Sequence, residues 1–133
     1  MSKQYEQIKK KIYPLPELLP QIKEWKRLGQ QIVFTNGCFD LIHLGHINYL
    51  AEASDLGEKL ILGVNSDDSV RRLKGHARPI QDQMARMIIL AAFEFTDAVV
   101  LFEEDTPESL IKQVTPDVLV KGGDYEPENV VGA

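Results

Sequence analysis

Short apolar runs alternate with helix-like stretches along this chain, and this alternation restricts the fold more than any other feature. The runs occupy residues 32–35, 59–64, 98–102 and 117–120, and polar or glycine-rich residues follow each of them. Apolar runs of this length with helical periodicity between them are typical of buried strands that are joined by helices. The order predicts an α/β protein in which right-handed crossovers build a parallel sheet with helices on both faces.

The expected helices are indicated by apolar spacing and by residues suited to helix ends. Two stretches, 17–28 and 47–56, have the spacing, and the residues expected to face inward are Leu18, Ile22, Trp25, Leu28, Leu50, Ala53 and Leu56. Asp82 can cap a helix that reaches about residue 93, and Thr106 can cap another helix that begins with Pro107. We interpret 65–79 as a polar connection and 1–16 as a lead-in to the domain.

Chemically suggestive residues follow three of the predicted strands, in segments 36–46, 65–78 and 121–124. In an open parallel sheet, ligands bind at the carboxyl ends of the strands. We therefore expect these three segments to converge on one binding site.

Size and charge exclude several classes of protein. The 133 residues suit a single domain spanning 1–133. A net charge of −5 argues against a nucleic-acid-binding face, and no apolar stretch is long enough to predict a membrane helix. The N-terminus lacks the apolar run of a signal peptide, and the single cysteine, Cys38, suits a reducing cytosol. We expect a cytoplasmic protein that binds neither nucleic acid nor membrane.

The positive charges of the second half of the chain are concentrated in one window. Within sixteen residues lie Arg71, Arg72, Lys74, Arg78 and Arg86, with Asp82 as the only acid among them. In an acidic protein such a concentration can form a local anion site. The alternative is a solvated loop and helix face.

The segment with the most chemical information contains His43 and His46, separated by three positions, with Gly45 between them. If a helix begins near Gly45, its first N–H groups form an anion site to which the histidines can add donors. One alternative is structural, with a histidine and Asp40 holding a loop in place. Another is a metal site that uses Cys38, Asp40 and both histidines, although their spacing matches no common zinc pattern. Phosphate recognition is the best interpretation of this segment when the cation window is also considered.

Other nucleotide and nucleophile signatures are absent from the chain. It contains neither the glycine-rich dinucleotide fingerprint nor a P-loop, and it has no nucleophile elbow. Cys38 could act as a nucleophile, but a buried, inert thiol beside a glycine turn is the simpler interpretation.

Two short strings, GCFD at 37–40 and HLGH at 43–46, resemble the signature of the HxGH cytidylyltransferase-like nucleotidyltransferase superfamily. Its members bind a nucleoside triphosphate on a Rossmann-like sheet. Further segments are similar to the branch that adenylylates heptose 1-phosphate in ADP-heptose and lipopolysaccharide synthesis. They are VNSDDSVRRLKG at 64–75, RPI at 78–80, EEDTP at 103–107 and DVLVKGGDY at 117–125.

The resemblance implies an enzyme that transfers AMP from ATP to a sugar 1-phosphate and releases pyrophosphate. It implies catalytic roles for His43, His46 and Lys74. The implied nucleotide-binding residues are Thr35, Asn36, Gly37, Cys38, Phe39, Gly45, Arg86, Lys121, Gly122, Gly123 and Asp124. The implied substrate-binding residues are Asp40, Asn65, Ser66, Asp67 and Arg71.

The resemblance also bears on cofactors, partners and competing functions. Mg²⁺ is expected to arrive with ATP rather than on protein ligands, and the enzyme can assemble as a homo-oligomer. Asp40 has the alternative role of bracing its loop. Two other functions stay open: a cytidylyltransferase acting on glycerol phosphate or a similar alcohol phosphate, and a nucleotide-binding module without catalysis.

Relatives in this branch are often fused behind a sugar kinase, and their chains carry a further strand and a Ser-Thr-Thr segment that opens a helix near the triphosphate. Residues 1–133 contain neither feature. We therefore expect this chain to fold and to bind nucleotide weakly, with a strongly reduced turnover that recovers when the further strand and the helix are added.

Overall fold

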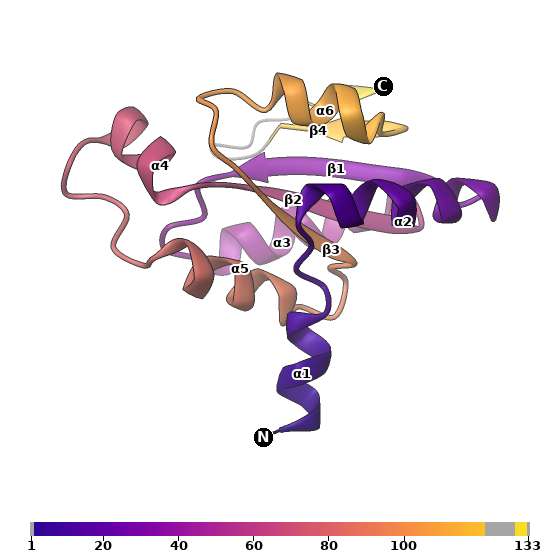
Figure 1. Ribbon diagram of the computed structural model, residues 1–133, viewed down its shortest axis with the longest axis horizontal. Helices are drawn as coiled ribbons and strands as arrows, with labels where there is room; N and C mark the ends of the chain where they lie inside the picture. Colours follow the sequence, from indigo (N-terminus) through magenta and orange to yellow (C-terminus); the bar gives the residue numbers. More distant parts are fainter. Residues whose placement is uncertain (1, 122–129, 133) are drawn as a thin grey trace.

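The computed structural model describes residues 2–121 and 130–132, and its centre is a five-stranded sheet in the order β3-β2-β1-β4-β5 (Figure 1). The strands β1 to β4 are parallel, whereas β5 pairs with β4 in the antiparallel direction. Their bounds are Ile32–Gly37 for β1, Lys59–Asn65 for β2, Ala98–Phe102 for β3, Val118–Val120 for β4 and Val130–Gly132 for β5. The predicted parallel sheet is confirmed, and β5 is an addition to it.

Helices cover both faces of the sheet, as predicted. Their bounds are Lys3–Lys9 for α1, Leu15–Arg27 for α2, Leu44–Ser54 for α3, Asp67–Lys74 for α4, Gln83–Ala91 for α5 and Glu108–Val114 for α6. The helices α3 and α5 pack on one face and α2 and α6 on the other (Figure 1). Alternation along β1 explains the two layers, because Val33 belongs to the first core and Ile32 and Phe34 to the second.

Most of the inward-facing residues were predicted correctly, and the errors lie at helix ends. Leu18, Ile22, Trp25, Leu50 and Ala53 are buried. Leu28 and Leu56 follow the last residues of α2 and α3 and remain 57% and 47% exposed. Asp82 caps α5 through its bond from the Ala85 N–H, as predicted. The predicted cap of α6 was wrong, because Pro107 occupies that position without a side-chain hydrogen bond.

Helix α4 replaces what we interpreted as a polar connection, and this correction matters for the site. Ser66 is its N-cap, with Oγ accepting the Ser69 N–H. Acidic residues occupy the first turn and basic residues the last, which favours the helix dipole. Gly75 ends the helix with φ of +98°, a conformation that favours glycine. All of these signals are local, so α4 could have been predicted.

The predicted lead-in is part of the domain, because it covers an edge of the sheet. Ile12 forms a parallel bridge with Val99, and Tyr13 N–H donates to the Val99 carbonyl at 2.9 Å. The segment thereby occupies backbone groups of β3 that an exposed edge strand would leave unpaired. None of the helices in the described residues has the length and apolar character needed to cross a bilayer.

Candidate active site

A cavity of about 480 Å³ opens at the carboxyl ends of β1 and β2. The described residues that line it are Asn36, Gly37, Cys38, Phe39, Asp40, Leu41, His43, His46, Asn65, Leu73, Lys74, Arg78 and Asp105. Two of the three segments expected to converge therefore meet here. From the third segment, Lys121 is not among the described lining residues, and Gly122, Gly123 and Asp124 lie outside the described part of the chain.

The two histidines cap helix α3 reciprocally. His43 is the N-cap, and its Nδ1 accepts the Gly45 N–H at 3.0 Å, while His46 Nδ1 accepts the His43 N–H at 3.2 Å. The ring centroids lie 4.1 Å apart. This is the arrangement of a capping box, with imidazoles in the places usually taken by a hydroxyl and a carboxylate.

The capping bonds determine which nitrogen of each neutral imidazole carries the proton. Because Nδ1 accepts a backbone N–H in both rings, the proton is on Nε2. Both rings line the cavity at a helix N-terminus, where an anion is favoured. The structural and phosphate-binding interpretations are therefore compatible, since capping uses Nδ1 and phosphate recognition requires Nε2–H.

The absence of a side chain at Gly45 leaves room for the His43 ring. A Cβ atom at this position would lie 2.8 Å from Cε1 and 3.0 Å from Nδ1 of His43. Any side chain at this position would therefore displace the imidazole from its capping bond.

The loop after β1 turns sharply at Phe39, whose φ of +50° lies in the left-handed region. This conformation costs a residue with a Cβ about 1–2 kcal/mol. The Phe39 ring is buried and meets the His46 ring edge-on, with 6.0 Å between centroids. Thr35 is buried within β1 and is not a lining residue.

Asp40 braces the loop that precedes α5. Its Oδ2 accepts from Arg78 Nη1 at 2.9 Å, and its Oδ1 accepts the backbone N–H groups of Ile80 and Gln81 at 2.8 and 3.1 Å. Burial acts to raise the pKa of this carboxyl, but the hydrogen bonds from Arg78 and the two backbone groups outweigh it and hold the pKa below its ordinary value. The bracing alternative for Asp40 therefore describes its contacts better than substrate binding.

A pH dependence of stability follows from these bonds. Because folded Asp40 binds its proton more weakly than unfolded Asp40, it stabilises the fold above the unfolded pKa of about 3.9. This contribution is lost as the pH falls through the lower folded pKa. We expect Asp40→Asn to destabilise the protein by about 1–3 kcal/mol at pH 7 and to lessen the fall in stability between about pH 5 and 3. Urea unfolding of both proteins across this range measures the difference, and parallel curves would contradict it.

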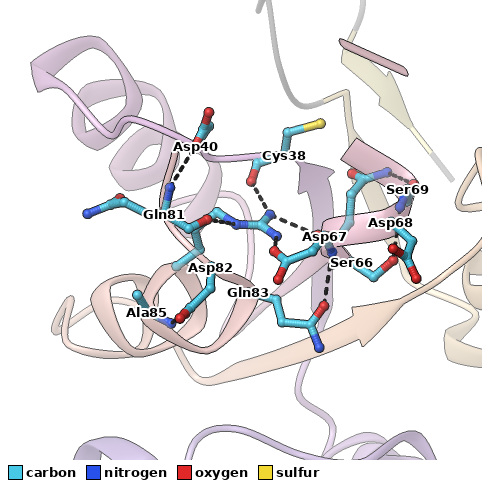
Figure 2. Close-up of polar contacts among 12 residues, drawn as sticks. Cys38, Asp40, Ser66, Asp67, Asp68, Ser69, Gln81, Asp82, Gln83 and Ala85 are labelled. Atoms are coloured by element: carbon cyan, nitrogen blue, oxygen red, sulfur yellow. Dashed lines mark hydrogen bonds and ion pairs between the residues drawn. The ribbon is translucent and has the colours of Figure 1, made fainter. Parts of the chain in front are cut away.

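Arg86 was predicted to bind nucleotide, but its side chain is buried and bonded to other groups of the protein. Its side chain is 0% exposed. Nη1 donates to the carbonyls of Cys38 and Asn65 at 2.6 and 2.8 Å, Nε donates to the Gln81 carbonyl at 3.1 Å, and Nη2 pairs with Asp67 at 2.7 Å. Figure 2 shows the Cys38 carbonyl, Gln81 and Asp67 converging on one guanidinium. Arg86 therefore connects the backbone segments next to the cavity rather than donating hydrogen bonds into it.

The three residues Asn65, Ser66 and Asp67, implied to bind substrate, are bonded mainly within the protein. Asn65 lines the cavity, although its amide nitrogen donates to Ser69 Oγ at 3.0 Å. Ser66 is buried as the cap of α4, and Asp67 pairs with Arg86. Among the three, Asn65 alone is positioned to meet a ligand in the cavity.

Neither metal binding nor nucleophilic chemistry gains support from the loop after β1. Within the described residues, no group of three or more His, Cys, Asp and Glu side chains is arranged to hold a metal ion. Burial raises the pKa of the Cys38 thiol despite the positive charges of Lys74 and Arg86. The thiol is therefore protonated at neutral pH, as expected of an inert cysteine.

The cation window divides into groups with different functions. Lys74, at the end of α4, and Arg78 line the cavity. Arg71 pairs with Asp68 on the same helix and lies outside the cavity, so its predicted substrate contact is not supported. Arg72 is not among the described lining residues and pairs with Asp105 at 2.8 Å.

Lys74 should contribute to phosphate binding, whereas Arg71 should not. We expect Lys74→Ala to weaken ATP binding by about 10- to 100-fold, the effect of losing a hydrogen bond between charged groups. Arg71→Ala removes the same charge from the same helix and is expected to change the dissociation constant less than about 2-fold. Calorimetric titration with ATP measures both values. Equal, small effects of both variants would show that the cation window is a solvated surface and not a phosphate site.

Four lining residues were not predicted as site residues: Leu41, Leu73, Arg78 and Asp105. Leu41 and Leu73 could not be identified from the sequence, because leucine has no reactive group and occurs frequently in all parts of proteins. Arg78 was noted in the cation window and in the RPI string at 78–80, but neither assigned it a role in the site. Asp105 belongs to the segment after β3, and the EEDTP string at 103–107, directly after a predicted strand, was the sequence signal that could have identified it.

The chain is similar to known proteins in sequence and in structure. A family model described as cytidylyltransferase-like matches residues 34–129, which include every described lining residue of the cavity. The bifunctional protein HldE of Nitratiruptor sp. is 60% identical over 111 residues, covering 84% of this chain and 24% of that protein. HldE of Haemophilus ducreyi is 58% identical over 110 residues, covering 83% and 23%. The chain thus spans about a quarter of the length of these curated relatives.

Among solved structures, the chain is similar to a lipopolysaccharide core biosynthesis protein from Thermoplasma volcanium GSS1. The two share 34% sequence identity with a TM-score of 0.65, and the match covers 74% of this chain and 79% of the other.

Proposed function

Because this chain belongs to the cytidylyltransferase-like family, we propose that it is an adenylyltransferase that joins ATP to heptose 1-phosphate in the cytoplasm. The products are ADP-heptose and pyrophosphate. One observation supports nucleotidyl transfer most directly: the capped histidine pair at the start of α3 lines the same cavity as Lys74. This cavity combines a helix N-terminus, two Nε2–H donors and an ammonium group, which together suit a triphosphate.

The reaction needs alignment and charge stabilisation more than proton transfer. An oxygen of the acceptor phosphate, already ionised at neutral pH, attacks the α-phosphorus of ATP. A new P–O bond forms while the bond from the α-phosphorus to the bridging oxygen breaks, and pyrophosphate leaves with that electron pair. His43, His46 and Lys74 would donate hydrogen bonds to the phosphate oxygens on which charge accumulates.

The cavity offers little for a resident Mg²⁺ ion. Both oxygens of Asp40 are engaged by Arg78 and by backbone N–H groups, and the described residues contain no ready group of metal ligands. In this proposal Mg²⁺ travels with the triphosphate, because Mg²⁺ commonly binds through phosphates and waters with few protein ligands.

The choice of ATP and a heptose phosphate is supported by similarity rather than by cavity geometry. The segments at 64–75 and 117–125 resemble the heptose branch, and the HldE relatives are 50–60% identical to this chain. Assembly as a homo-oligomer is part of the same proposal, and light scattering measures it.

Pyrophosphate release tests the proposed function. The chain is incubated with ATP or CTP, each combined with heptose 1-phosphate or glycerol 3-phosphate, and released pyrophosphate is quantified. We expect the highest kcat/KM for ATP with heptose 1-phosphate. Higher turnover of CTP with glycerol 3-phosphate would reassign the substrates. Nucleotide binding without pyrophosphate release in any combination would identify a binding module.

A further inference from the structure

We propose that Asp105 determines acceptor specificity by accepting hydrogen bonds from hydroxyl groups of the sugar phosphate. This inference rests on the proposed function, since it assigns a residue to the acceptor half of that reaction. Asp105 belongs to the EEDTP string that resembles the heptose branch, but that resemblance assigned it no role, and its position in the cavity follows from the sheet order.

Asp105 reaches the cavity because β3 lies beside β2. The residue follows β3, which ends at Phe102, and it lines the cavity that contains the two histidines of the loop after β1. Neighbouring strands are about 4.8 Å apart, so the end of β3 lies roughly 10 Å from the end of β1. Asp105 therefore marks the side of the cavity farthest from β4.

The loop carrying Asp105 is held by helix α4. Arg72 Nε donates to Asp105 Oδ1 at 2.8 Å, and Arg72 Nη2 also donates to the Glu103 carbonyl. Ser69 Oγ donates to the Glu104 carbonyl at 3.1 Å. Three consecutive residues are thereby fixed to α4. The Asp105 side chain stays 58% exposed, and its Oδ2 receives no hydrogen bond from the described residues.

The charges around the cavity indicate what this carboxylate can recognise. Phosphate groups are expected near Lys74 and the histidines, and a carboxylate repels them. Asp105 must therefore face an uncharged part of a ligand, and a hydroxyl group is a suitable donor for Oδ2. Among the described lining residues, the other carboxylate is Asp40, which already accepts three hydrogen bonds. Of these two described carboxylates, Asp105 is the one with an oxygen available for a hydroxyl.

The hydroxyls belong to the acceptor rather than to the ribose of ATP because of the sheet order. In β3-β2-β1-β4, the strand order reverses between β1 and β4, and nucleotides bind at such a reversal. Asp105 lies on the opposite side, beyond β2. A polyhydroxylated sugar attached to the attacking phosphate would occupy that side.

Steady-state kinetics of Asp105→Ala test the inference. We expect the KM for heptose 1-phosphate to rise by about 10- to 100-fold and the KM for ATP to change less than about 2-fold. Asp68→Ala is the matched control, because Asp68 also pairs with an arginine of α4 but lies outside the cavity. With methyl phosphate as acceptor, which has no alcohol hydroxyl, Asp105→Ala should raise the KM for the acceptor much less than it does with heptose 1-phosphate.

A second variant separates recognition from loop positioning. Arg72→Gln keeps the carboxylate but loosens its support, so we expect a smaller rise in the KM for heptose 1-phosphate. Added to Asp105→Ala, it should have little further effect, because both changes act through one group.

The outcomes distinguish this inference from the proposed function. If the wild type releases no pyrophosphate with heptose 1-phosphate, the proposed function fails and the inference fails with it. If the wild type is active and Asp105→Ala leaves the KM for heptose 1-phosphate unchanged, the inference alone is overturned. A rise confined to the KM for ATP would assign the carboxylate to ribose or to Mg²⁺ and would also overturn it.

Discussion

His46→Ala is expected to lower kcat by about 10²- to 10³-fold, the effect of removing one preorganised donor from a developing negative charge. The Nε2–H of His46 stands at the N-terminus of α3 on the cavity wall, held there by the bond from the His43 N–H to Nδ1. Loss of that capping bond should cost only about 1 kcal/mol of stability. Most molecules would therefore remain folded, so the rate loss reports on chemistry.

Two conservative variants separate the two nitrogens of His46. The amide oxygen of asparagine can occupy the position of Nδ1 and accept the His43 N–H, whereas the longer glutamine amide can place a donor near the position of Nε2. We expect His46→Asn to retain stability with the low kcat of the alanine variant, and His46→Gln to recover part of the rate. Kinetics and urea unfolding of the three variants measure this. Full activity of His46→Asn would restrict the ring to a capping role.

Arg86→Met is expected to have the largest effect on stability, about 3–5 kcal/mol, because it removes a fully buried guanidinium from its ion pair with the partly buried Asp67. The change leaves the Asp67 carboxylate without its cation and removes the donors to three backbone carbonyls. Those carbonyls belong to the loop after β1, the end of β2 and the loop before α5. Urea denaturation with a comparison of m-values measures the loss and shows whether the folded state stays compact.

Milder variants keep this prediction testable if Arg86→Met does not fold. Arg86→Lys retains the charge, but one ammonium group cannot reproduce the planar set of donors, so we expect an intermediate loss. Asp67→Asn removes the charge of the partner and leaves the carbonyl bonds in place. Wild-type stability of Arg86→Met combined with a loss of ATP affinity would return Arg86 to nucleotide binding.

Much of the architecture was predictable because its signals are local. Strand and helix alternation depends on apolar periodicity, and the same periodicity identified Leu18, Ile22 and Trp25 as core residues. The HLGH string at 43–46 also carries its own geometry, since a three-residue spacing at a helix start brings both imidazoles to the first turn. Such features depend on neighbours within a few positions, and a sequence displays those neighbours directly.

The tertiary structure alone decided which members of the cation window face a ligand. Lys74 reaches the cavity, Arg72 supports Asp105, and Arg86 is buried against a carbonyl 48 positions earlier in the chain. All three are basic residues in one short window, so nothing local distinguishes them. The exposure of each depends on which distant loops pack around it. Long-range packing is set by the order of strands in the sheet. That order also brought Asp105 to the cavity, a position that its EEDTP string did not indicate.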